Sequence, residues 1–247
     1  LGNPFDMGAV LGFCKKYGLS LIEDNCDALG SVYHMPETLA ETLGKAGARA
    51  RRESLDGMCA RLTGTWGDLS TQSFYPPHHI TMGEGGAINI SEDLKLKWPL
   101  ESMRDWGRDC WCPSGEDNTC GKRFMWEFDE LPDGYDHKYV YSHIGYNLKP
   151  LDIQAAIGRE QLRRLPDFIK RRQQNWDILR RELNELEDYF DFMLPTHAIE
   201  RNAQTGSFSW DKTGCQTECS WFGFMLSVKP DAGFTAQQFG RALSEHN

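Results

Sequence analysis

The sequence of 247 residues lacks several features that would point to particular classes of protein. No apolar run approaches the roughly 20 residues that a helix needs to span a bilayer, and no basic-then-apolar leader is present. Positive charge is scarce, because 27 Lys and Arg face 36 Asp and Glu. The resulting net charge of −9 argues against binding nucleic acid or an anionic membrane. The sequence shows no internal repeat and no low-complexity tract, so we expect an ordinary globular protein of the cytoplasm.

The chain also lacks an initiator methionine, since it begins at Leu1 in mid-pattern and stops inside an expected helix. We therefore expect a piece of a longer protein, and the missing leader says little by itself. A chain of this length can still bury a substantial core, as one large domain or two.

Cysteine is too scarce for a disulfide scaffold but frequent enough to need an explanation. The eight cysteines are Cys14, Cys26, Cys59, Cys110, Cys112, Cys120, Cys215 and Cys219. Three of them follow a C-x-C-x7-C spacing from Cys110 to Cys120, and Cys26 can supply a fourth thiolate. Four thiolates suit either zinc or an iron–sulfur cluster. The spacing alone leaves both metals open, with free core thiols as a third possibility.

A helix predicted over residues 7–17 leads directly into a buried strand over 19–23. This order is half of a βαβ unit, so it predicts an α/β fold with a parallel sheet. Ligands bind at the carboxyl ends of such strands, and this strand ends in Asp24 and Cys26. A carboxylate there can hold the protonated ring nitrogen of a pyridoxal-type cofactor, although a helix cap or a surface turn is its commoner use.

Three later stretches carry a resemblance to a known family. They are Ser73-Phe74-Tyr75-Pro76-Pro77-His78, Gly83-Glu84-Gly85-Gly86 and Gly145-Tyr146-Asn147. Together with the acidic strand end they resemble the DegT/DnrJ/EryC1/StrS sugar aminotransferase family of fold-type I pyridoxal phosphate enzymes. The resemblance covers the chain apart from residues 35–62 and 199–219. It implies a mostly parallel sheet with flanking helices, plus part of a small C-terminal α+β domain.

The same resemblance implies a division of the chain. Residues 1–165 would belong to a large cofactor-binding domain, and residues 166–247 to a linking helix and a partial small domain. In this picture Pro166 starts a new helix. Residues 35–62 look like a basic, helical surface insertion, and residues 199–219 like a loop insertion. Cys14 is then expected in the core, while Cys59, Cys215 and Cys219 lie on the insertions.

One residue departs from the family pattern, because His78 stands where the family has a lysine. A lysine amine forms a Schiff base with the cofactor aldehyde, and an imidazole cannot. The departure implies non-covalent pyridoxamine phosphate, with His78 as a base that removes a proton and so expels a β-hydroxyl. The reaction would be dehydration instead of transamination. The alternative is an inactive aminotransferase that lost its lysine.

Within the family, the resemblance is closest to the branch of CDP-6-deoxy-4-hexulose 3-dehydrases. The matching stretches are Ile22 to Ser31, Ser73 to Ala87, Arg104 to Lys122 and Tyr135 to Lys149. That branch implies a [2Fe–2S] cluster on Cys26, Cys110, Cys112 and Cys120, the last three within an ordered loop at about 107–137. It also implies a separate flavin or iron–sulfur reductase that supplies electrons, and a 3,6-dideoxyhexose for lipopolysaccharide O-antigen as the eventual product.

The remaining site residues are assigned by resemblance. Asp24 would pair with the pyridinium nitrogen, Ser73 would contact the cofactor phosphate, and Asp27 would pack near the cofactor ring. Asn147 would reach the phosphate of a neighbouring subunit, which implies a homodimer. For Asp27 and Asn147 a turn or a cap is an equally ordinary role.

Two further hypotheses stay open beside the main one, which is dehydration of a nucleotide-linked 4-keto-6-deoxyhexose. One is a 3-dehydratase of the same family that needs no cluster, and the cysteines argue against it. The other is a catalytically silent relative that binds a metal or a partner.

Overall fold

The computed structural model describes residues 1–52, 54–91, 94–110, 112 and 115–246. Contacts divide the chain into two units, one of residues 1–89 with 156–247 and one of residues 90–155. Each unit is described by itself. This division differs from the boundary at 165/166, so the domain boundary of the protein as a whole stays a prediction.

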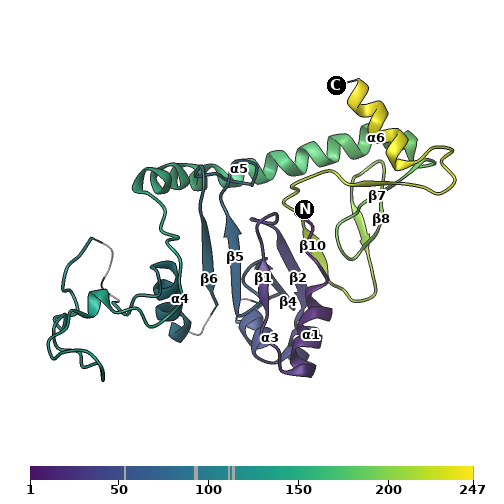
Figure 1. Ribbon diagram of the computed structural model, residues 1–247. Coiled ribbons are helices and arrows are strands. Elements are labelled where there is room, and N and C mark those ends of the chain that lie inside the picture. The colour runs from purple at the N-terminus through teal and green to yellow at the C-terminus, as the bar shows by residue number, and fades with distance from the viewer. Residues whose placement is uncertain (53, 92–93, 111, 113–114, 247) are drawn as a thin grey trace. The chain divides into compact units, whose positions relative to one another are not determined.

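The first unit contains a three-stranded sheet in the order β1-β5-β6 (Figure 1). The strands are β1 (Ile22–Asp24), β5 (Leu69–Ser73) and β6 (Gly86–Ile90). The predicted parallel pairing is confirmed for β1 and β5, which place Asp24 opposite Thr71. In β1 and β5 buried residues alternate with more exposed ones, so Asp24, Thr71 and Ser73 share one face.

A buried carboxylate fastens β1 to the turn that precedes β5. Both oxygens of Glu23 accept backbone hydrogen bonds, from Gly64 at 2.7 Å, Trp66 at 2.8 Å and Gly67 at 2.7 Å. The Glu23 side chain lies on the opposite face of β1 from Asp24. Its contacts therefore hold the strand whose end carries the candidate cofactor aspartate.

The helix α1 (Met7–Tyr17) confirms the sequence prediction at both ends. The Asp6 side chain accepts from the Ala9 amide, and Gly18 ends the helix with φ 64°. Met7 and Leu11 of α1 are buried in the main apolar core.

Residues 32–62 are not confined to the surface, which corrects that part of the prediction for 35–62; that they are an insertion stays a prediction. They form β2 (Val32–Pro36), α2 (Glu37–Ala40), η1 (Glu41–Leu43), α3 (Gly44–Arg51), β3 (Ser54–Leu55) and β4 (Met58–Leu62). With β10 (Gln216–Glu218) the strands make an antiparallel sheet in the order β10-β2-β4-β3. Met35, Leu43 and Cys59 are buried in one core with α1. The pairing of β2 with β4 turns weakly apolar segments into a packed layer.

The expected cysteine positions are corrected in the same way. Cys59, Cys215 and Cys219 are buried, while Cys14 is only partly buried. The segment 199–219 also contains strands: β8 (Ala198–Arg201), β9 (Phe208–Trp210) and β10. These three buried cysteines are therefore core residues of the first unit.

The helix α5 runs unbroken over Asp152–Glu182, with Pro166 inside it. The prediction that Pro166 starts a new helix is therefore wrong. Trp176 of α5 stacks on Trp221 with ring centroids 4.9 Å apart, in a second apolar core with Cys219. The last elements are η4 (Asn184–Leu186), β7 (Phe190–Phe192), β11 (Leu226–Val228) and α6 (Ala236–Glu245). A capping box of Thr235 and Gln238 opens α6.

The second unit has little regular structure among its described residues. It holds η2 (Leu94–Leu96), α4 (Lys97–Arg104) and η3 (His137–Tyr139), besides the first residues of α5. The sequence also predicts a helix from Glu92 to about Met103, and its start lies outside the described residues. Isolated bridges pair Asp105 with Asn147 and Arg108 with Tyr141. No helix in the described part of the chain is long and apolar enough to cross a membrane.

Candidate functional sites in the two units

Asp24 and Cys26 lie together at the end of β1. The Cys26 amide donates to Asp24 Oδ1 at 3.1 Å, and the Thr71 hydroxyl donates to the same oxygen at 3.5 Å. Hydrogen bonds from the Cys26 thiol and amide lower the pKa of Asp24, and nearby His78 lowers it further. Asp24 is therefore an ionised carboxylate at neutral pH, exposed at the carboxyl end of a parallel strand.

The pKa of Cys26 is shifted in the opposite direction from that of Asp24. Its sulfur lies 4.0 Å from the Thr71 hydroxyl oxygen. Burial, followed by the contact with Asp24, raises the pKa of Cys26 to about 11. Without a metal this thiol stays protonated, because a thiolate beside an ionised carboxylate is disfavoured.

His78 lies in the turn between β5 and β6 and is held at both ring nitrogens. Its Nδ1 atom is 3.2 Å from the Ser73 carbonyl oxygen, and its Nε2 atom is 3.1 Å from Asp27 Oδ1. Tyr75 packs edge-on against the ring, with centroids 4.3 Å apart. A carbonyl oxygen only accepts, so Nδ1 carries a proton. A carboxylate also only accepts, so a hydrogen bond from Nε2 to Asp27 forms when Nε2 carries a proton as well.

The neighbouring His79 has a structural setting. Its side chain is buried, and its Nε2 atom lies 2.7 Å from the Ser220 carbonyl oxygen. Burial lowers the pKa of His79 to about 4, and the Arg172 guanidinium acts in the same direction. His79 is therefore neutral at physiological pH and ties the turn to the segment after β10.

The second unit gathers three cysteines around a buried histidine. One ring nitrogen of His137 and the sulfurs of Cys110 and Cys112 all lie within 4.8 Å of one another. The Cys120 sulfur lies 3.9 Å from His137 Nε2 and also accepts from the Lys122 amide at 3.4 Å. The structure thus brings together three of the four predicted metal ligands, and adds an imidazole.

The thiols of this group differ in acidity. A hydrogen bond from the Thr119 hydroxyl, followed by contacts with Cys120 and Cys110, lowers the pKa of Cys112 to about 7. Burial raises the pKa of Cys110. A thiolate available near neutral pH is the form in which cysteine binds metal.

A cavity of about 400 Å³ opens at this group of thiols. Cys110, Cys112 and His137 line it, together with charged side chains of both signs. His137 is 1% exposed, and its Nδ1 atom has no hydrogen-bond partner among the described residues. Buried polar atoms are rarely left without a partner, so the cavity wall fits a group that is absent from the bare chain.

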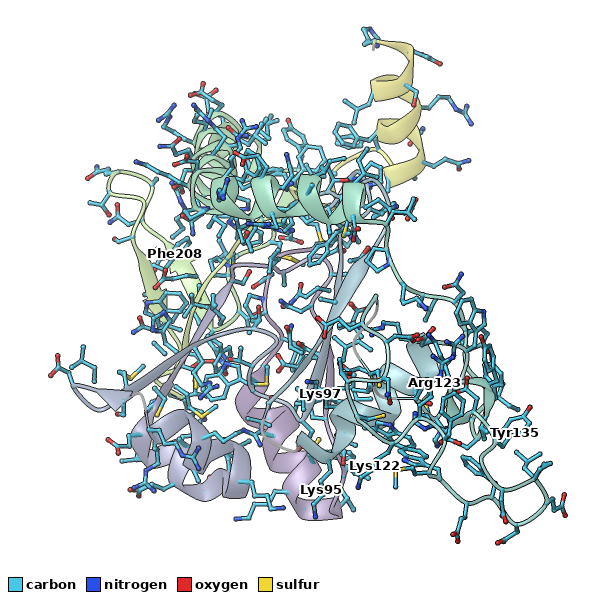
Figure 2. The ribbon with its side chains drawn as sticks, turned by 90° about the vertical axis from the view of Figure 1, so that its left-hand side faces the viewer. Lys95, Lys97, Lys122, Arg123, Tyr135 and Phe208 are labelled. Atoms are coloured by element: carbon cyan, nitrogen blue, oxygen red, sulfur yellow. The ribbon has the colours of Figure 1, made fainter. Side chains whose placement is uncertain are left out.

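Arg123 fixes the loop around the cavity. Its guanidinium contacts Asp136 at 2.7 Å and Asp117 at 2.8 Å, and its carbonyl accepts from the His137 amide at 3.2 Å. Figure 2 labels Arg123 and Tyr135 on this irregular segment. The ion pairs take the place of regular secondary structure in holding His137.

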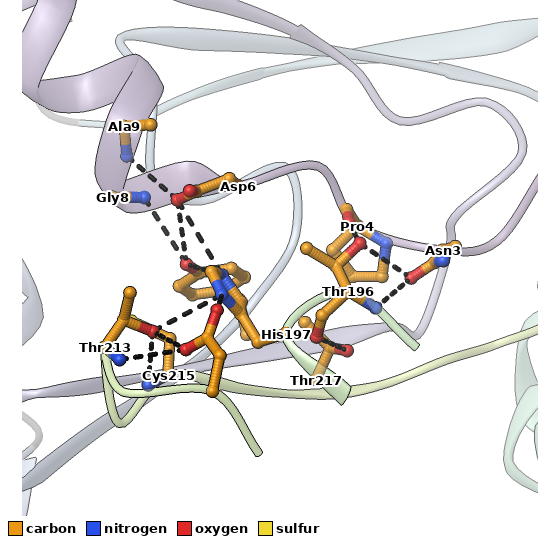
Figure 3. Close-up of polar contacts among 12 residues, drawn as sticks. Asn3, Pro4, Asp6, Gly8, Ala9, Thr196, His197, Thr213, Cys215 and Thr217 are labelled. Carbon is orange, nitrogen blue, oxygen red and sulfur yellow. Dashed lines mark hydrogen bonds and ion pairs between the residues drawn. The ribbon is translucent and has the colours of Figure 1, made fainter. Parts of the chain in front are cut away.

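A further polar network joins β2, the N-cap of α1 and the segment before β8 (Figure 3). His197 places Nε2 2.7 Å from the Tyr33 hydroxyl and Nδ1 2.9 Å from Asp211. Asp6, the N-cap of α1, lies 3.4 Å from the Tyr33 hydroxyl. Burial raises the pKa of Tyr33, whose side chain is fully buried, so the phenol stays neutral. We assign this network to stability.

Sequence reasoning placed some site residues together and missed others. Asp24, Ser73 and His78 lie around the ends of β1 and β5, and Asp27 contacts His78. Asn147 is exposed and pairs with Asp105 in the second unit. The roles assigned to these residues stay predictions. His137 was missed, because a single histidine 17 residues after Cys120 has no diagnostic spacing.

A model of the DegT/DnrJ/EryC1/StrS aminotransferase family matches residues 1–247. The chain is 41% identical over 247 residues to dTDP-4-dehydro-2,6-dideoxy-D-glucose 3-dehydratase of Saccharopolyspora spinosa, covering 100% of this chain and 44% of the relative. It is 41% identical over 245 residues to lipopolysaccharide biosynthesis protein RfbH of Salmonella typhimurium, covering 99% of this chain and 46% of the relative. The chain therefore spans less than half the length of both.

Solved structures show a similar fold. The chain is similar to the E. coli GDP-4-keto-6-deoxy-D-mannose-3-dehydratase with bound hydrated PLP, with a TM-score of 0.64 and 24% identity. That comparison covers 100% of this chain and 49% of the other. An aminotransferase, TlmJ from Streptoalloteichus hindustanus, gives a TM-score of 0.61 at 20% identity, covering 100% of this chain and 48% of the other. These likenesses confirm the predicted α/β class of the fold-type I enzymes.

Proposed function

Because the chain belongs to the DegT/DnrJ/EryC1/StrS aminotransferase family, we propose that its protein removes the C3 hydroxyl of a nucleotide-linked 4-keto-6-deoxyhexose. The proposal is carried by His78, which by resemblance takes the place of the family's lysine and contacts the Ser73 carbonyl and Asp27. Similar chains bear the names of 3-dehydratases of dTDP- and GDP-linked sugars. We propose a CDP-linked sugar and a place in lipopolysaccharide synthesis, for which the similar RfbH is named.

The residues at the end of β1 fit pyridoxamine phosphate. When bound, this cofactor supplies an amine that combines with a ketone and a ring that withdraws electrons. Asp24 is exposed, and its lowered pKa keeps the negative charge that a protonated ring nitrogen needs. Ser73 ends the neighbouring strand on the same face and would donate its hydroxyl to the phosphate.

His78 is the residue we assign to proton transfer. It carries no primary amine, so it leaves the cofactor free of a covalent bond to the chain. Its Nδ1–H donates to the Ser73 carbonyl, which leaves Nε2 to take up or release a proton. Asp27 faces Nε2 at 3.1 Å and would hold the ring in position through each proton transfer.

The thiols of the second unit fit an iron–sulfur centre. When bound, such a centre accepts and passes on one electron at a time. Cys110, Cys112 and Cys120 line or adjoin the cavity that His137 also lines. We propose Cys26 as the fourth ligand and a separate flavin or iron–sulfur reductase as the electron donor.

We also propose that the protein works as a homodimer, with Asn147 reaching the cofactor phosphate of the second subunit. Asn147 is exposed, which such a contact requires.

The test is oxygen exchange at C3. The purified protein is mixed with pyridoxamine phosphate and CDP-, dTDP- or GDP-linked 4-keto-6-deoxyglucose in H₂¹⁸O, without a reductant. Reversible loss of the C3 hydroxyl predicts ¹⁸O at C3, fastest with the CDP-linked sugar. A protein that binds the cofactor but exchanges no oxygen with any of the three sugars would contradict the proposal and favour a silent relative.

The metal content then decides between the two dehydratase hypotheses. Exchange by a colourless protein without iron supports the cluster-free enzyme. Exchange by a brown protein that contains iron and acid-labile sulfide supports the cluster and its reductase.

A further inference from the structure

The buried side chain of His137 has no assigned role. Its ring stacks on Trp126, with centroids 4.2 Å apart and an angle of 24° between the planes. The Asp136 side chain caps η3 by accepting from the Lys138 amide. The backbone and the ring are thus both fixed, so the imidazole is held in one orientation before any ligand binds.

The orientation directs one ring nitrogen at a sulfur. His137 Nε2 lies 3.9 Å from Cys120 Sγ, a long hydrogen bond to sulfur. The other nitrogen, Nδ1, is buried without a partner in the described part of the chain. The same ring lies within 4.8 Å of the sulfurs of Cys110 and Cys112. A histidine with a purely structural role would form hydrogen bonds to other protein groups. The polar neighbours of the His137 ring are thiols instead.

We propose that His137 is a positioning residue of the metal centre, which donates an Nε2–H hydrogen bond to the Cys120 thiolate and raises the centre's reduction potential. The proposal rests on the iron–sulfur centre of the proposed function. Cys120 Sγ already accepts from the Lys122 amide, so the imidazole is its second donor. Hydrogen bonds to ligand sulfur disperse negative charge and favour the reduced, more negative form of a cluster.

Two substitutions and one matched control test this role. His137→Phe keeps the ring and its stacking on Trp126 but removes the donor, whereas His137→Gln keeps an N–H donor. The control is His143→Phe in the same unit, because His143 also packs on a tryptophan but contacts serines instead of thiols. The readout is the midpoint potential of the anaerobically purified protein, titrated with dithionite and followed by electron paramagnetic resonance.

We expect His137→Phe to shift the potential to a more negative value at unchanged iron content. His137→Gln should restore part of the shift, and His143→Phe should match the wild type. An unchanged potential and spectrum in His137→Phe would overturn the proposal, as would an equal shift in all three variants.

A measurement on the wild type covers the case in which the variants lose their metal. Protein labelled with ¹⁵N-histidine is reduced and examined by pulsed electron paramagnetic resonance. A weak nitrogen coupling from a donor beside the cluster supports the proposal. A strong coupling from nitrogen bound to iron, or none, contradicts it. A protein without iron contradicts the iron–sulfur centre itself. The ¹⁸O test of dehydration depends neither on the nitrogen coupling nor on the iron content.

Discussion

The Nε2 atom of His78 lies 3.1 Å from the Oδ1 atom of Asp27. The other ring nitrogen donates to a backbone carbonyl, so the imidazole is fixed at both ends. In the proposed function, a lysine here would bring a flexible amine, whereas His78 would bring one proton-transfer atom in a set orientation. In the proposed function, this pair connects the sequence departure at residue 78 to dehydration instead of transamination.

If His78 transfers the proton, replacing it should slow turnover strongly without loss of fold. We expect His78→Asn to lower the rate of C3 oxygen exchange by about 10²- to 10⁴-fold, the usual contribution of general acid–base catalysis. The matched control is His34→Asn, because His34 also pairs with a carboxylate, Glu218, at 2.8 Å but lies in the antiparallel sheet of β10, β2, β4 and β3. Equal losses of rate in both variants would contradict the assignment of proton transfer to His78.

Metal content tests the thiol group of the second unit directly. Cys112 has the lowered pKa that suits a metal-bound thiolate, and it lines the cavity with Cys110. We expect Cys112→Ser to lose most of its iron and acid-labile sulfide but to keep C3 oxygen exchange. The control Cys14→Ser, on α1, should keep both. Iron retained in full by Cys112→Ser would exclude this cysteine as a ligand.

The buried carboxylate of Glu23 should matter for stability. In Glu23→Gln one oxygen becomes an NH₂ group, which faces a backbone N–H instead of accepting from it. A lost charged hydrogen bond and an unsatisfied buried donor together cost roughly 2–4 kcal/mol. Urea unfolding of Glu23→Gln measures this loss. The control is Glu200→Gln at an exposed position, which should change the free energy of unfolding by less than about 0.5 kcal/mol. A similar loss of stability in both variants would contradict the role of Glu23.

The free energy of unfolding should also decrease as the pH is lowered, because of His79. The pKa of His79 is lowered from 6.5 to about 4 by burial, so the unfolded chain binds the proton first as pH falls. Its contribution is fully present above pH 6.5 and is lost as pH falls to 4. Since one pKa unit is worth about 1.4 kcal/mol, the loss is on the order of 3 kcal/mol.

Urea midpoints at several pH values between 7.5 and 4.5 measure this effect. His79→Asn removes the titrating group, so the variant should be less stable at pH 7.5 but show a shallower decline. An identical slope in the wild type and in His79→Asn would show that other groups set the pH dependence.

Local signals explain what the sequence could predict of the fold. The limits of α1 follow from Asp6 and Gly18, and the start of α6 follows from its capping box. The burial of residues 35–62 could not be read in this way, because it depends on pairing β2 with β4 and β10. The prediction of a helix start at Pro166 was wrong for a related reason. Proline favours the first turn of a helix, but α5 continues through Pro166.

The candidate sites show the same difference between residues in local motifs, which could be predicted, and contacts that depend on the fold, which could not. Asp24, Ser73 and His78 were identified because they sit in a motif with fixed spacing. The partnership of His78 with Asp27 was not, since it depends on how the turn after β5 folds back toward β1. His137 carries no spacing signal, and only its burial beside Cys120 identifies it.

The most direct test of the central claim is the fate of the amine and of the C3 hydroxyl in one turnover. Purified protein loaded with one equivalent of ¹⁵N-pyridoxamine phosphate is mixed with CDP-4-keto-6-deoxyglucose and a reducing system, and the sugar product is analysed by mass spectrometry. Dehydration at C3 predicts a sugar that has lost the C3 oxygen and carries no ¹⁵N. A sugar that keeps its C3 hydroxyl and carries ¹⁵N at C4 would show transamination and contradict the account.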